Sequence, residues 1–188
     1  MNDTGYWWYD RIEAAGKTID PKNNADMISP LFWLIRGNEF KITRSDDSQH
    51  TSLLQTTGNC LNGQTFRSKV TSYGDFRNGK AWYYSRCLGN CKVLYGGQYQ
   101  TTKGFGQATC NGTLQNGDRI GFWCNMGWSS SVMMIGGGGS NCSDAGHGIG
   151  VTASKSPSFK NDERPEREFG NSQWGPVTHN YALNLWIR

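Results

Sequence analysis

Long apolar runs are absent from this chain of 188 residues, and charged residues make up only 18% of it. The longest apolar run, residues 31–35, is far shorter than the roughly 20 residues that a membrane-spanning helix needs. The sequence therefore predicts no membrane span. Glycine is plentiful, with 25 residues, which argues against a helical bundle, and the low charge argues against a disordered tail. We expect short strands and long loops.

Runs of like charge are also missing. The 19 basic and 15 acidic side chains are scattered along the chain and give a formal net charge of +4. No segment is therefore suited to follow a phosphate backbone. We expect no nucleic-acid partner.

The motifs of common catalytic sites are missing as well. His50, His147 and His179 do not have the spacing of a zinc site. The chain has no nucleophile elbow, and the four glycines at 136–139 lack the lysine that completes a phosphate-binding loop. We expect no enzymatic activity.

Cysteine is present in an even number, which favours disulfides over a zinc ribbon because no C-x-x-C pair occurs. The six residues are Cys60, Cys87, Cys91, Cys110, Cys124 and Cys142. Cys87 and Cys91 bracket a Leu-Gly-Asn turn that could join their sulfurs or send them to separate partners. Fifteen connectivities remain open.

Disulfides favour a secreted or lumenal protein, because thiols stay reduced in the cytosol. Glycosylation sequons at Asn2, Asn111 and Asn141 support the same compartment. The chain opens without the basic and apolar regions of a signal peptide, so we expect a fragment or the mature part of a longer precursor.

The chain divides into an irregular lead-in, residues 1–28, and a recognition domain, residues 29–188. In the lead-in we expect only a short helical turn over residues 10–15. Seven strands are predicted from runs bounded by Gly, Asn or Asp, at 31–35, 39–43, 65–71, 92–95, 119–124, 131–135 and 181–187. They indicate an antiparallel, β-rich core.

The last strand alternates two sets of residues, which predicts one buried face: Tyr181, Leu183, Leu185 and Ile187 against Ala182, Asn184 and Trp186. Residues 136–175, in contrast, show almost no periodicity. A connection of this length inside a compact domain is more often a binding loop than a connection without a function.

The four glycines at 136–139 are costly to order, so the backbone there must approach something closely. Tight packing beneath Trp123 or Trp128 is one explanation. The other is a loop that places Asp144 and nearby carbonyls around a Ca²⁺ ion, which takes six to eight oxygen ligands.

From residue 29 to residue 188 the chain resembles the C-terminal portion of the intelectins, or X-type lectins, a branch of the fibrinogen-related family. The isoleucine at 135 followed by four glycines is the most specific match. The other matching segments are 52–59, 122–127, 142–144 and 183–188. The resemblance implies an α+β, β-rich, fibrinogen-like domain with short antiparallel strands, irregular loops and disulfides.

The resemblance also implies a Ca²⁺-dependent lectin in which Asp144 takes the place of an acidic metal ligand. The family's Asn/Glu/His cluster before the glycines does not carry over, because residues 129–134 hold only hydroxyls, thioethers and a valine. Asp162 and Glu163 lie in the local concentration of acids that could replace it, although the same residues are also explained by a solvated loop of mixed charge. Trp128, His147 and Trp174 could wall a sugar, or they could be core residues.

We therefore expect a secreted glycoprotein that binds glycans or cell-surface glycoconjugates, with Ca²⁺ as a candidate cofactor. Association with further copies of the chain is left open. The alternative is an extracellular matrix or adhesive structural domain that has lost the sugar site, and a third hypothesis is a hydrolase on an unrelated β scaffold.

Overall fold

The computed structural model of the chain describes residues 6–16, 20–22, 27–75, 88–95, 119–125, 132–137, 147–152, 167–168 and 182–188. Its helices are α1 (Tyr6–Tyr9), α2 (Leu31–Leu34) and α3 (Phe66–Thr71). Its strands are β1 (Arg36–Gly37), β2 (Phe40–Arg44), β3 (Leu54–Thr57), β4 (Gln64–Thr65), β5 (Leu88–Tyr95), β6 (Arg119–Asn125), β7 (Val132–Gly137), β8 (His147–Thr152), β9 (Arg167–Glu168) and β10 (Leu183–Ile187).

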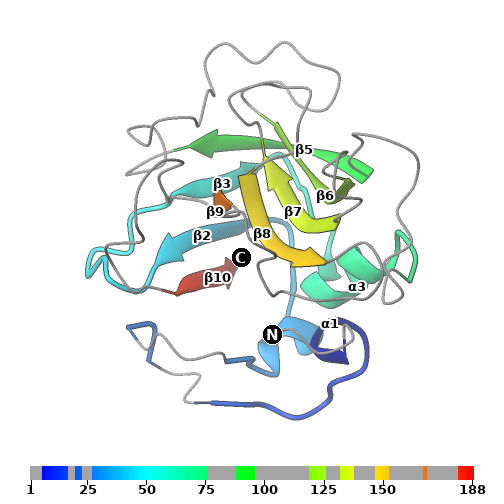
Figure 1. Cartoon of the computed structure of the whole chain (residues 1–188), viewed down its shortest axis with the longest axis horizontal. Helices are drawn as coiled ribbons and strands as arrows, with labels where there is room; N and C mark the ends of the chain where they lie inside the picture. The colour runs from blue at the N-terminus through cyan, green and yellow to red at the C-terminus, as the bar shows by residue number, and fades with distance from the viewer. Residues whose placement is uncertain are drawn as a thin grey trace.

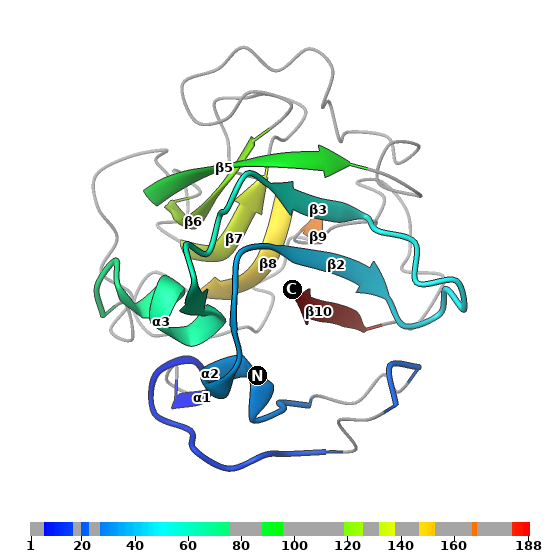
Figure 2. The same ribbon diagram turned by 180° about the vertical axis from the view of Figure 1, so that it is seen from behind.

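The architecture is a curved eight-stranded sheet in the order β10-β2-β3-β5-β6-β7-β8-β9, as Figure 1 shows. All described pairs in it are antiparallel except β8 with β9. The C-terminal strand β10 returns to the edge beside β2. The three helices lie at one end of the sheet (Figures 1 and 2). The expected α+β, strand-rich and mainly antiparallel class is confirmed.

The core lies between one face of the sheet and the helices. Successive strand residues point to opposite faces, and on β2 the inward residues Phe40 and Ile42 are almost fully buried. The Phe40 ring meets Phe66 of α3 edge to face at 5.2 Å, and Phe66 lies 6.4 Å from Phe122 of β6. Burying each of these side chains stabilises the fold by about 1.5–3 kcal/mol. The aromatic cluster therefore holds α3 against the sheet.

Two predicted strands, at 31–35 and 65–71, are wrong, because Leu31–Leu34 form helix α2 and Phe66–Thr71 form helix α3. Short apolar runs do not distinguish the two periods. In α3 the side chain of Thr65 accepts a hydrogen bond from Ser68 N–H at 3.1 Å, a helix N-cap. Phe66 and Val70, four residues apart, then face the core together.

The predicted helical turn at 10–15 is also wrong, because the helix begins and ends earlier, at Tyr6–Tyr9. Trp8 explains the difference, since the earlier position buries its ring to 5% exposure, 5.5 Å from Phe32. The guanidinium of Arg67 on α3 donates to the Trp7 carbonyl at 3.0 Å and lies 4.7 Å from the Trp33 ring. One cation thus ties α1, α2 and α3 together.

The other five predicted strands are confirmed to within a few residues, as β2, β5, β6, β7 and β10. Strands β3 and β8 were not expected. In β8 the sequence His-Gly-Ile-Gly-Val-Thr has no clear apolar period, because glycine takes every second place early in the strand. The expectation that residues 136–175 lack strands is therefore wrong for β8, which pairs with β7 along most of its length, and for the short strand β9, which pairs with β8.

Candidate functional site

Four residues stand directly opposite one another across β10, β2, β3 and β5. In order they are Trp186, Lys41, Gln55 and Leu94. Because their neighbours along each strand point into the core, this row lies on the opposite face of the sheet. Leu94 is 64% exposed. Figure 2 shows these four strands side by side.

We call this surface the outer face. It includes the row above, the adjacent row Thr57, Lys92 and Arg119, and the pair Glu39 and Arg188. Lys92 lies opposite Arg119 on neighbouring strands.

Trp186 is held in place by contacts on three sides. Its indole N–H donates to Thr43 Oγ1 at 2.8 Å, and Thr43 is fully buried beneath the outer face. The Lys41 ammonium lies 5.3 Å from the indole centroid, within the range of a cation–π interaction. The His50 ring lies 5.3 Å from the same indole. The indole orientation is therefore set before any ligand arrives.

The loop between β2 and β3 positions His50. Both carboxylate oxygens of Asp47 accept backbone hydrogen bonds, from Gln49 N–H at 2.9 Å and Thr51 N–H at 2.8 Å. His50 sits between them in the left-handed region with φ 49°. Hydrogen bonds from the Thr51 side chain and the Gln49 backbone keep the Asp47 pKa below its ordinary 3.8.

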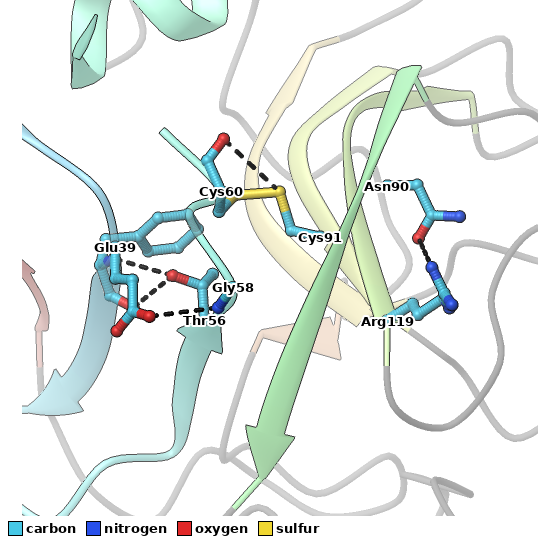
Figure 3. Close-up of a disulfide and its surroundings, with 8 residues drawn as sticks. Glu39, Thr56, Gly58, Cys60, Asn90, Cys91 and Arg119 are labelled. Atoms are coloured by element: carbon cyan, nitrogen blue, oxygen red, sulfur yellow. Dashed lines mark hydrogen bonds between the residues drawn. A yellow bond between two sulfur atoms is a disulfide. The ribbon is translucent and has the colours of Figure 1, made fainter. Parts of the chain in front are cut away.

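Three other charged groups of the outer face have local partners. Arg119 Nη1 donates to Asn90 Oδ1 at 3.0 Å, and Figure 3 shows the two side chains reaching toward each other from β6 and β5. Arg188 donates to Glu39 Oε2, while Glu39 Oε1 accepts from Gly58 N–H at 3.1 Å. Arg188 is thereby bound to the start of β2.

A disulfide supports β5 from the buried side. Cys60 and Cys91 are bonded across 31 residues and are 7% and 6% exposed (Figure 3). The expected disulfide chemistry is confirmed for this pair, and the alternative of a local Cys87–Cys91 bridge is excluded. Cys87, Cys110 and Cys142 lie outside the described residues, and for Cys124 the description covers its backbone in β6.

The glycine run begins inside the sheet. Gly136 pairs with Gly121 on β6 and with Gly148 on β8, so three glycines cross neighbouring strands in one row. Gly136 and Gly137 are therefore strand residues, and the close approach expected of the run is, for these two, an approach to other strands. The Trp123 indole donates to the Val70 carbonyl of α3 at 2.6 Å.

Of the predicted ligand-binding and metal residues, His147 begins β8, where its backbone lies opposite Gly137 and Arg167. The others lie outside the described residues: Trp128, Asp144, Asp162, Glu163 and Trp174, together with the sequons at Asn111 and Asn141. In the described part of the chain, no group of three His, Cys, Asp or Glu side chains could hold a metal ion.

Sequence reasoning missed Trp186. The terminal strand was predicted to be structural because Leu183, Leu185 and Ile187 alternate, and these three do pack against the core. The same alternation places Trp186 on the other face, where a tryptophan is unusual unless it has a partner or a ligand. That signal was present in the sequence.

Comparison with protein families, with curated proteins and with solved structures finds no match to this chain. Among the described residues, no helix is both long enough and apolar enough to cross a membrane.

Proposed function

We propose that this chain is an extracellular recognition module of the fibrinogen/intelectin-like group that binds carbohydrate, and that the outer face is a glycan-binding surface. The observation that carries the proposal is the row Trp186, Lys41, Gln55 and Leu94. The first three are partly exposed, and Leu94 is 64% exposed. A sugar ring has an apolar C–H face and a rim of hydroxyl groups. An indole beside an ammonium and an amide matches both parts.

The rigidity of the row supports this function. Binding is stronger when the receiving groups need no ordering, because side-chain immobilisation costs about 0.5–1.5 kcal/mol each. The hydrogen bond from Trp186 to Thr43 and the contact with Lys41 immobilise the indole during folding, so that little further ordering is needed on binding. The Cys60–Cys91 disulfide supports the extracellular compartment.

The Ca²⁺ site that we propose is formed by residues outside the described part of the chain. Asp144, Asp162 and Glu163 are the proposed ligands, and a bound Ca²⁺ would supply coordination sites for sugar hydroxyls. The outer face is a separate surface whose groups need no metal.

A glycan array probed with the labelled chain, with Ca²⁺ and with EDTA, tests the function. Trp186→Phe removes the indole, and Trp33→Phe is the matched control because both indoles are partly buried beside a cation. We expect Trp186→Phe to weaken glycan binding about tenfold or more, and Trp33→Phe to leave it unchanged.

Silence across the array from a folded chain would overturn the proposal. With a melting temperature that EDTA leaves unchanged, it would support the structural or adhesive domain instead. Equal losses of glycan binding in the two variants would show that the outer face is not the glycan-binding surface. Binding that survives EDTA but requires Trp186 would support the outer face and contradict a calcium-dependent site.

A further inference from the structure

The outer face carries more positive than negative charge. Lys41, Lys92, Arg119 and Arg188 lie on it, and among its described residues Glu39 supplies the carboxylate. Glu39 is engaged by Arg188 and by the Gly58 N–H. Lys41, in contrast, lies over a neutral indole.

These positive charges are spread along a line that crosses the strands, with Lys41 in one row and Lys92 and Arg119 in the adjacent row, rather than gathered at a point. Neighbouring strands are about 4.8 Å apart. Lys41 on β2 and Arg119 on β6 are separated by three strand steps, which corresponds to about 14 Å. A single small anion can contact one end of this line only, whereas a chain with repeated negative groups can contact all of it.

The groups between the charges suit sugar rings. Gln55 on β3 lies between the strands that carry Lys41 and Lys92, and the 64% exposed Leu94 lies two residues from Lys92 on β5. Trp186 lies at the end of the row. An amide can bond to hydroxyls, and the leucine offers an apolar contact to a C–H face. Anionic substituents would then fall on the flanking lysines.

We infer that the ligand of the outer face is a linear sulfated polysaccharide that runs across the strands, from Trp186 on β10 toward Arg119 on β6. This inference rests on the proposed function and names its ligand class. Single-stranded nucleic acid fits less well, because it needs a series of aromatic platforms, whereas this row holds one indole followed by an amide and an aliphatic side chain.

The inference requires binding that weakens with salt. Exposed charges are screened beyond about 8 Å at physiological ionic strength, and the release of counterions from a polyanion adds to this dependence. Recognition by stacking and neutral hydrogen bonds would depend little on salt.

The test measures binding of the folded chain to immobilised heparin, to fully desulfated heparin and to a neutral dextran. The site variant is Lys92→Gln with Arg119→Gln. The matched control is Arg36→Gln with Lys69→Gln. It also removes two positive charges, but at positions that are not on the outer face. A second pair compares Lys41→Gln with Lys69→Gln, because both ammoniums lie over an aromatic ring, at 5.3 Å and 5.4 Å.

We expect the affinity for heparin to fall about tenfold or more between about 50 mM and about 300 mM NaCl. The site variant should weaken heparin binding about tenfold at low salt, and the control less than about twofold. Lys41→Gln should weaken binding, whereas Lys69→Gln alone should not. Melting temperatures establish that each variant is folded.

Equal affinity for desulfated and sulfated heparin would overturn the inference and leave carbohydrate binding in place. Failure to bind any glycan would overturn both. Equal weakening by the site and control variants would show attraction to net charge rather than to this face. Tighter binding of a single-stranded oligonucleotide of equal charge would assign the face to nucleic acid and also overturn the inference.

Discussion

Trp186 and Thr43 are joined across the edge of the sheet by a 2.8 Å hydrogen bond from the indole N–H to the buried threonine hydroxyl. Each residue lies two positions from the other's register partner, so both side chains are on the same face and the bond runs diagonally between β10 and β2. A buried hydroxyl thereby fixes the orientation of an indole on the outer face. The edge strand and the candidate site are therefore stabilised by the same contact.

Comparing Thr43→Val with Thr56→Val should separate an effect on glycan binding from an effect on stability. Thr43→Val removes the acceptor of the indole N–H and should lower the free energy of unfolding by about 1 kcal/mol and weaken glycan binding. Thr56→Val is the matched control, because Thr56 is also fully buried but bonds to the Phe40 backbone. It should destabilise the fold without changing affinity in a binding assay. Equal effects on affinity would contradict the role of Thr43.

Reduction of the Cys60–Cys91 bond should destabilise the domain by about 2–4 kcal/mol, because the bridge limits the unfolded chain over a separation of 31 residues. The double replacement Cys60→Ala with Cys91→Ala, compared with the wild type in urea unfolding, measures this. Dithiothreitol should lower the melting temperature of the wild type more than that of the variant. An unchanged unfolding midpoint in the variant would contradict the prediction.

A side chain at position 89, in place of Gly89, should destabilise the fold. Gly89 has φ 68°, and an added Cβ would clash with the Tyr73 hydroxyl oxygen. Gly58 has φ 77° with nothing within 4 Å of an added Cβ, so Gly58→Ala isolates the backbone cost of about 1–2 kcal/mol. Gly89→Ala should cost about 1–3 kcal/mol more than that.

Tyr73→Phe removes the nearest clashing atom and should recover part of the additional loss in a double-mutant cycle measured by urea unfolding. Additive effects of Gly89→Ala and Tyr73→Phe would show that this contact is not the cause.

Asp47 should contribute to stability in a pH-dependent manner. Its folded-state pKa lies below 3.8, so the stability it adds is fully present above that value and is lost as the pH falls through the folded pKa. Between about pH 5 and about pH 2 the wild type should therefore lose more unfolding free energy than Asp47→Asn. Thr51→Val removes the largest cause of the shift and should give an intermediate slope. Parallel curves for all three proteins would contradict the assignment.

Much of the sheet was predictable from local pattern. Strands β2 and β10 carry the alternation that one-sided burial requires, and the apolar runs of β5, β6 and β7 are bounded by turn-forming residues. The helices were mistaken for strands because the runs at 31–35 and 65–71 are too short to show a period. Their identity depends on a cap at Thr65 and on burial of Phe32 and Phe66 against residues distant in sequence.

The candidate site could be predicted only in part. The sequence directed attention to the glycine run and to acids in the following segment, of which Gly136 and Gly137 prove to be sheet residues. Trp186 and Lys41 are separated by 145 positions, so no local pattern connects them. Their register is set when β10 returns to the edge of β2.

The sequence by itself determined that the chain forms a β-rich, disulfide-bonded domain, because these properties follow from residue types and local periods. Only the tertiary structure decided that Cys60 pairs with Cys91 and that cations and an indole share one face. Such pairings depend on strand order and register, which arise from the burial of side chains far apart in the chain.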